Sequence, residues 1–195
     1  MEKTPNFIVG IGASAGGLNA YKAFFDAMPP NTGMAFVVIS HIHPAAHSQL
    51  AVILSRHTSM PVALAETGVE VRANQVYVIP TNADLFIEKG ALRVVSPRSG
   101  RNCQVNLFFT SLAAAMGKRA VGIVLSGYDG DGAEGCRRIN AAGGTTFAQD
   151  ISAEVAEMPL SAQATGCIDH VLDPGEIPAE LDKLIARFES GSPKG

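Results

Sequence analysis

The feature that most constrains the fold of this 195-residue chain is a regular alternation of two hydrophobic periodicities. Short runs rich in Val and Ile, several of them apolar on both faces, indicate the strands of a parallel sheet covered by helices. We predict strands at Phe7 to Gly10, Ala35 to Ser40, Gln75 to Ile79, Ala120 to Leu125, Thr145 to Ala148 and Ile168 to Val171.

Segments with apolar residues at helical spacing separate these runs. The first, Gly17 to Met28, ends before Pro29 and Pro30, which cannot continue a helix. Further helices are predicted at Ser48 to His57, Val105 to Met116, Gly132 to Ala142, Ser161 to Thr165 and Ile177 to Phe188. The alternation predicts a wound α/β domain, in which helices flank a mostly parallel sheet in a Rossmann-like three-layer arrangement.

One section departs from this rhythm. Two alternating segments, Asp84 to Glu88 and Ala91 to Val95, are separated only by Lys89-Gly90, which predicts a small antiparallel hairpin. The length of the chain suits a single buried core. We therefore expect one domain over residues 1–190 and a flexible tail at 191–195.

Composition narrows the classes of function. The net charge is −3 with a pI near 5.9, and Lys and Arg do not cluster, so no nucleic-acid partner is expected. The cysteines, Cys103, Cys136 and Cys167, are widely spaced and predict reduced thiols and no cofactor. Without a signal peptide or an apolar stretch of roughly 20 residues, the chain is expected to be cytoplasmic and not inserted in the membrane.

A glycine-rich segment, Gly10 to Gly17, follows the first predicted strand and precedes the first predicted helix. As a glycine-rich loop it could hold a phosphate against the N-terminus of that helix, as in dinucleotide-binding domains. Its core, Gly12-Ala13-Ser14-Ala15-Gly16, also matches G-x-S-x-G, in which small neighbours allow a sharp turn that presents a serine hydroxyl. A helix N-cap is the commonest role of a serine such as Ser14, and this third interpretation stays open at this point.

The end of the second strand helps to separate these interpretations. A dinucleotide site usually has an acidic residue there to bind the ribose hydroxyls. Here the strand ends in Ser40-His41, and an imidazole is the usual proton acceptor from a nucleophilic serine. The carboxyl ends of strands are also where catalytic groups of open α/β sheets gather. His41 therefore favours an esterase over a nucleotide-binding module.

A third strand end, Leu125 to Ala133, carries two carboxylates in a glycine-rich turn. Either Asp129 or Asp131 could accept the second N–H of the histidine and stabilise the imidazolium. Each also has an ordinary structural role available, as a turn residue or a helix N-cap. The spacing does not choose between the two carboxylates.

Three histidines close together raise the question of zinc. His41, His43 and His47 have the spacing of metal ligands, but no cysteine or acidic ligand stands nearby to complete the site. We predict no metal.

Taken together, these motifs resemble the catalytic domain of CheB-type protein-glutamate methylesterases. The resemblance is carried by Gly12 to Gly17, the strand that ends in His41 before Pro44, Val105-Asn106-Leu107-Phe108, the turn Leu125 to Ala133, Gln149-Asp150 and Met158-Pro159, all in the order of the family. It covers nearly the whole chain. It implies Ser14 as nucleophile, His41 as base and Asp131, instead of Asp129, as the third member of a triad.

The resemblance also implies an activity and partners. The family hydrolyses methyl esters of glutamate side chains on the cytoplasmic helices of chemotaxis receptors, and deamidation of receptor glutamines is a plausible second activity. Backbone N–H groups of Ala15 and Gly16, or Tyr128, are expected to stabilise the oxyanion. A catalytically idle adaptor that docks to receptors is the alternative function, ahead of a nucleotide-binding module.

Three positions depart from the common family pattern: Ser40 replaces a frequent Gln, Tyr128 a frequent Met, and Ala15 a frequent Thr. The Ala15 version resembles the branch in which the esterase is joined to a methyltransferase, so fusion to or cooperation with such an enzyme is expected. Regulated members carry a receiver domain before the esterase. The first strand begins near residue 6 here, so no receiver domain is expected in this chain.

Overall fold

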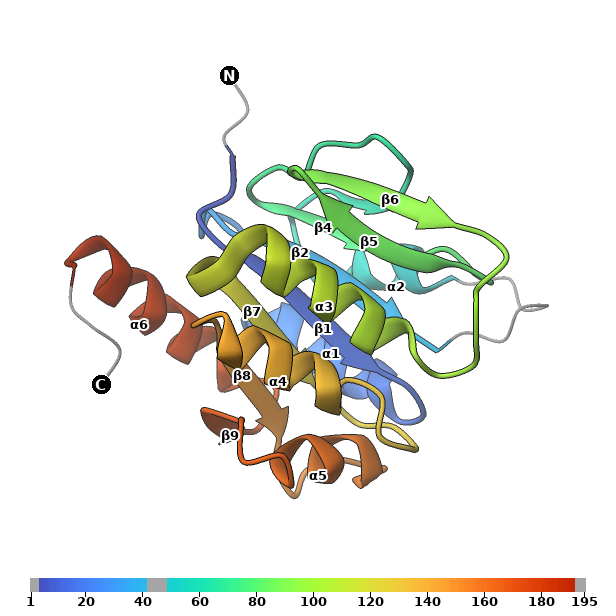
Figure 1. Cartoon of the computed structure of the whole chain (residues 1–195). Helices are drawn as coiled ribbons and strands as arrows, with labels where there is room; N and C mark the ends of the chain where they lie inside the picture. The colour runs from blue at the N-terminus through green and yellow to red at the C-terminus, as the bar shows by residue number, and fades with distance from the viewer. Residues whose placement is uncertain (1–3, 42–48, 192–195) are drawn as a thin grey trace.

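The computed structural model of the chain describes residues 4–41 and 49–191. Within these residues, a seven-stranded parallel sheet has the order β3, β4, β2, β1, β7, β8, β9 (Figure 1). Its strands are β1 (Ile8–Ala13), β2 (Ala35–Ser40), β3 (Val62–Leu64), β4 (Gln75–Val78), β7 (Ala120–Val124), β8 (Thr145–Gln149) and β9 (His170–Leu172). An antiparallel hairpin, β5 (Asp84–Glu88) and β6 (Ala91–Val95), forms a second small sheet.

Helices cover both faces of the main sheet and make three layers (Figure 1). One face is covered by α1 (Gly17–Ala27), α2 (Leu50–Leu54) and α6 (Ile177–Glu189). The other face is covered by α3 (Gln104–Met116), α4 (Ala133–Ala141), α5 (Glu157–Gln163) and the hairpin, and a short 3-10 turn, η1 (Gly117–Arg119), precedes β7. Each face has its own hydrophobic core, as expected when parallel strands are buried on both sides.

The predicted fold class is confirmed, including the hairpin. The helix predicted at Ser161 to Thr165 is misplaced, because α5 begins at Glu157 and contains Pro159 in its first turn. A proline is tolerated there because backbone N–H groups of the first turn have no partner within the helix. The short edge strand β3 was not predicted, since its three residues are too few to form a pattern.

The second predicted helix is shorter than expected. It was predicted at Ser48 to His57, whereas α2 spans only Leu50–Leu54. The Ser55 hydroxyl donates to the carbonyl of Val52 (2.9 Å), one of the local bonds with which serine competes against helix continuation. The predicted start at Ser48 lies outside the described residues, as does the tail from residue 192 onward.

Two glycines of β1 explain how closely α3 approaches the sheet. A Cβ on Gly12 would lie 2.5 Å from the side chain of Val105, and one on Gly10 would lie 2.8 Å from Phe109. These glycines therefore make room for a helix that packs directly on β1. The close packing brings the N-terminus of α3 to the carboxyl end of the sheet.

The order of the strands creates a switch point beside β1. From β1 the chain continues to β2 on one side, and it later returns to pair β7 on the other. The helices that follow β1 and β7, α1 and α4, lie on opposite faces of the sheet. In open α/β sheets, ligands bind outside the carboxyl ends of strands at such a point. The turns after β1 and β7 and the end of β2 meet there.

Candidate functional site

Ser14 lies in the sharp turn between β1 and α1. Its N–H donates to the carbonyl of Ser126 (2.9 Å), and its own carbonyl accepts the N–H of Gly17 (3.0 Å). The residue in the N-cap position of α1 is Gly16, and no side chain caps this helix. The interpretation of Ser14 as an N-cap is therefore wrong, because its hydroxyl does not cap α1.

Gly16 is required by the shape of this turn. Its φ of 73° lies in the left-handed region, and a Cβ would come within 2.6 Å of the Ser126 hydroxyl and 2.7 Å of Glu154 Cβ. The Ser126 hydroxyl donates to the carbonyl of Ala15 (2.8 Å) and accepts the N–H of Val155 (2.9 Å). The turn that presents Ser14 is thus tied to the loop after β8.

His41 follows the last residue of β2, next to this turn. Ala13 and Ser40 are paired across the sheet, and the N–H of His41 donates to the carbonyl of Ala13 (3.3 Å). Because neighbouring strands lie about 4.8 Å apart, the backbones of Ser14 and His41 are adjacent. The Tyr21 hydroxyl beneath them donates to the carbonyl of Ile39 (2.9 Å), and burial raises the pKa of this phenol above its ordinary value, so it stays a donor.

The imidazole of His41 pairs with Asp131, which comes from the turn after β7. His41 Nε2 lies 2.7 Å from Asp131 Oδ2, and the two side chains are 5% and 0% exposed. Since a buried carboxylate needs compensating donors, its remaining contacts decide whether it can stay charged.

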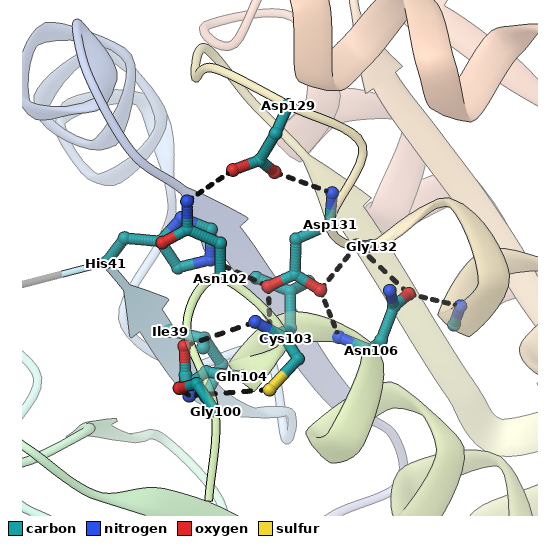
Figure 2. Close-up of polar contacts among 12 residues, drawn as sticks. Ile39, His41, Gly100, Asn102, Cys103, Gln104, Asn106, Asp129, Asp131 and Gly132 are labelled. Carbon is teal, nitrogen blue, oxygen red and sulfur yellow. Dashed lines mark hydrogen bonds and ion pairs between the residues drawn. The ribbon is translucent and has the colours of Figure 1, made fainter. Parts of the chain in front are cut away.

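Backbone donors surround the Asp131 carboxylate (Figure 2). The N–H groups of Val105 and Asn106, in the first turn of α3, donate to Oδ2 and Oδ1, each at 2.9 Å. The N–H of Gly132 donates to Oδ1, also at 2.9 Å. An anion at a helix N-terminus is further favoured by the helix dipole. These contacts stabilise a negatively charged Asp131 that accepts a hydrogen bond from the Nε2–H group of His41.

The other imidazole nitrogen is available. His41 Nδ1 is buried and has no hydrogen-bond partner among the residues that the structure describes. If Nε2 carries the ring proton and donates a hydrogen bond to Asp131, then Nδ1 has the free lone pair and can act as a base. The Ser14 hydroxyl is not hydrogen-bonded to Nδ1 here, so the two groups must come closer before a proton can pass between them.

Asp129 lies outside this pair. One of its carboxylate oxygens accepts the side-chain N–H of Asn102 (2.6 Å), and the other accepts the N–H of Asp131 (3.0 Å) (Figure 2). Its own N–H donates to Glu157 (3.1 Å). Asp129 therefore shapes the turn at the surface, while the contact with the imidazole is made by Asp131.

The residues expected to stabilise an oxyanion lie around the same turn. Within the described part of the chain, the backbone N–H groups of Ala15, Gly16 and Tyr128 have no hydrogen-bond partner. Those of Ala15 and Gly16 lie at the N-terminus of α1. The Tyr128 side chain is 57% exposed, so it borders the site from the solvent side.

A metal site is not found in the described residues, where no group of three or more His, Cys, Asp or Glu side chains could hold an ion. His43 and His47, which raised the question, lie outside that part of the chain. His57 contacts Asp26 (2.8 Å), and His170 stacks on Phe147.

Sequence reasoning missed Ser126 and Gly127, which support the turn of Ser14. The sequence of that segment pointed to Asp129, Asp131 and Tyr128 and not to these two residues. A Cβ on Gly127 would lie 2.8 Å from Ser14 Cβ and 2.2 Å from Met158 Sδ, so only glycine fits between them. The signal was the glycine itself, directly after a strand that ends at the site.

The fold and the site together define a wound α/β domain that gathers a serine, a histidine and a buried aspartate at the carboxyl edge of its sheet, the arrangement of a serine hydrolase. The order along the chain is Ser, His, Asp, which differs from the Ser, Asp, His order of α/β-hydrolases. Comparison with known proteins identifies the family. The chain belongs to the CheB methylesterase family, whose model matches residues 9–181.

Individual relatives agree with this assignment. The chain is 36% identical over 180 residues to protein-glutamate methylesterase/protein-glutamine glutaminase 2 of Anaeromyxobacter dehalogenans, covering 91% of the chain but 53% of that protein. It is 33% identical over 175 residues to a putative enzyme of the same name in Leptospira interrogans, covering 88% of the chain and 90% of the relative. The chain therefore spans about half the length of the first relative and nearly all of the second.

A solved structure has the same fold. The CheB methylesterase catalytic domain of Thermotoga maritima superposes with a TM-score of 0.83 at 28% identity, covering 91% of this chain and 98% of that one. In the part of the chain described here, no helix is long and apolar enough to cross a membrane.

Proposed function

We propose that this chain is a serine esterase that removes methyl groups from glutamate side chains of chemotaxis receptors. The observation that carries the proposal is the buried His41–Asp131 pair, 2.7 Å apart, directly beside the turn that presents Ser14. The names of the Anaeromyxobacter and Leptospira relatives supply the substrate class. The catalytic residues are Ser14, His41 and Asp131.

The reaction is acyl transfer in two steps. The Ser14 hydroxyl attacks the ester carbonyl while His41 Nδ1 takes its proton, and Asp131 stabilises the resulting imidazolium through Nε2–H. The imidazolium then returns the proton to the methoxy oxygen, so that methanol leaves and an acyl-serine remains. Water, deprotonated by the same nitrogen, attacks the acyl-serine and releases the glutamate carboxylate and the free hydroxyl.

The tetrahedral oxyanion formed in both steps needs donors that are already in place. The unpartnered N–H groups of Ala15, Gly16 and Tyr128 are the candidates, and the positive end of α1 adds to the field at this position. An amide passes through a similar intermediate, with ammonia as the leaving group. Deamidation of receptor glutamine is therefore the second activity of the same site, in agreement with the names of the relatives.

The partners proposed for this site are the cytoplasmic helices of methyl-accepting receptors, and the domain is accordingly proposed to act in the cytoplasm. Cooperation with a methyltransferase is proposed from the Ala15 version of the serine motif. The catalytic domain is proposed to extend over residues 1–190, ahead of a flexible tail. A separate cofactor or metal has no part in the steps above.

The experiment is the Ser14→Ala variant, with Ser55→Ala as a control at an exposed serine far along the chain. Ser14→Ala should abolish methanol release from methylated receptor and leave the thermal unfolding curve unchanged, because among the described residues no side chain caps α1 and the loss of one hydroxyl removes little packing. A serine-directed phosphonate should label the wild-type chain at Ser14. Full activity of Ser14→Ala rejects the proposal, and receptor binding without labelling or turnover would favour the idle adaptor instead.

A further inference from the structure

Asn106 occupies the third position of α3 and contacts the Asp131 turn in two ways. Its backbone N–H donates to Asp131 Oδ1 (2.9 Å). Its side-chain oxygen accepts the N–H groups of Gly132 (3.0 Å) and Gly135 (2.7 Å) (Figure 2). One residue thus binds the carboxylate and the backbone that follows it.

The second contact replaces a missing helix cap. The N-cap position of α4 is Gly132, which has no side chain to satisfy the first N–H groups of the helix. It cannot readily be replaced, because its φ is 97° and a Cβ would lie 2.9 Å from Val124 and 3.0 Å from Val105. The amide oxygen of Asn106 fills this role from the neighbouring helix, with the acceptor geometry of an Asn N-cap.

The residue held in this way is the immediate neighbour of Asp131. On the preceding side of Asp131, the turn is held by Asp129, which is at the surface and accepts the N–H of Asp131 (3.0 Å). On the inner side, Asn106 joins the start of α4 to the start of α3. The position of Asp131, and with it the direction of the His41 ring, therefore depends on this side-chain amide.

We propose that Asn106 is a positioning residue for the His41–Asp131 pair. It acts through Asp131 and touches neither the substrate nor Ser14. As a neutral acceptor it caps α4 without placing a second negative charge beside the carboxylate. The proposal rests on the esterase function proposed above for its kinetic consequences, but the geometry that it describes can be tested without turnover.

The test compares Asn106→Ala, Asn106→Asp and Thr110→Ala in the full chain. Alanine removes the oxygen that accepts both N–H groups, whereas aspartate keeps an acceptor but adds a negative charge beside the Asp131 carboxylate. Thr110 is one turn further along α3 and its hydroxyl donates to the carbonyl of Asn106 (2.7 Å), so it controls for general effects on the helix. Since a displacement of about 1 Å can cost on the order of 100-fold in rate, Asn106→Ala should lower kcat by roughly 10- to 100-fold.

Two further readouts separate positioning from mere stability. KM for methylated receptor should stay within roughly threefold in Asn106→Ala, because the residue does not touch the substrate. Asn106→Asp should lose at least as much kcat as Asn106→Ala, because its negative charge lies beside the Asp131 carboxylate, and Thr110→Ala should match the wild type. The low-field proton resonance of His41 Nε2, assigned by its loss in Asp131→Asn, should weaken or move in Asn106→Ala and keep its wild-type position in Thr110→Ala.

The outcomes are distinguishable. A folded Asn106→Ala variant with wild-type kcat, or with an unchanged Nε2 resonance, overturns the proposal while leaving the esterase function intact. An equal loss of kcat in Thr110→Ala also overturns it. If the wild-type chain releases no methanol, the esterase function fails, and the resonance alone then decides whether Asn106 positions the pair.

Discussion

Replacement of Asp131 by Asn tests the central geometry of the site. Oδ1 accepts the N–H groups of Asn106 and Gly132, and Oδ2 accepts that of Val105 and faces His41 Nε2. An amide cannot match this pattern, because one of its two ends must be an NH₂ group. With NH₂ at the Oδ1 position, two backbone N–H groups face another donor. With NH₂ at the Oδ2 position, only the backbone N–H of Val105 faces another donor.

The second orientation should be preferred by roughly 1 to 3 kcal/mol, the cost of one unsatisfied buried donor. In that orientation the amide donates to His41 Nε2, which must then be the acceptor nitrogen. The ring proton moves to Nδ1, and the base is lost. By analogy with the same substitution in serine-protease triads, kcat should fall about 10⁴-fold, equivalent to about 5 kcal/mol in the barrier.

The assay is methanol release from methylated receptor under saturating conditions, together with urea unfolding. Asp131→Asn should lose roughly 1 to 3 kcal/mol of stability from the one remaining unsatisfied donor, so the variant is expected to fold. Asp129→Asn is the matched control and should keep kcat within about tenfold, since Asp129 does not contact the imidazole. A folded Asp131→Asn variant that loses less than tenfold in kcat would refute the tautomer argument.

Two other predictions follow from the same structure. Gly127→Ala should lower kcat more than tenfold and cost about 1 to 3 kcal/mol in urea unfolding, because the added methyl meets Ser14 and Met158; unchanged kinetics would contradict this. Burial would raise the pKa of Asp84, but hydrogen bonds from Ser99 and Gln104 outweigh it, and the pKa lies below the ordinary value. A carboxyl with a lowered pKa stabilises the fold above the pKa of the unfolded chain, near 4, and that stability is lost as pH falls through the folded value. Asp84→Asn should therefore be less stable than the wild type at pH 7, with the difference shrinking below about pH 4, and a constant difference across this range would count against the assignment.

Periodicity accounts for most of what could be predicted about the fold. The strand at Ala35 to Ser40 and both strands of the hairpin have the predicted bounds. These segments have dense, regular patterns. The errors fall where the pattern is short, as in β3, where a serine competes with the helix, as in α2, or where a proline is allowed by its place in the first turn, as in α5.

The individual site residues were also visible in the sequence, because each follows a strand and carries a chemically active side chain. Ser14, His41 and Asp131 were all selected on those grounds, with the family resemblance choosing Asp131 over Asp129. In the structure, the imidazole contact is made by Asp131. Their catalytic roles remain predictions until the variants above are measured.

The sequence by itself determined the layers of this domain, the turns that present polar groups and the family to which it belongs, because these depend on local periodicity and on motifs of adjacent residues. Only the tertiary structure decided that Gly10 and Gly12 admit α3 against β1, that α3 supplies backbone donors to Asp131, and that Asn106 caps α4. Those contacts join residues about 25 to 100 positions apart in the chain. Their partners are chosen by the packing of whole elements, and no local pattern in the sequence records that choice.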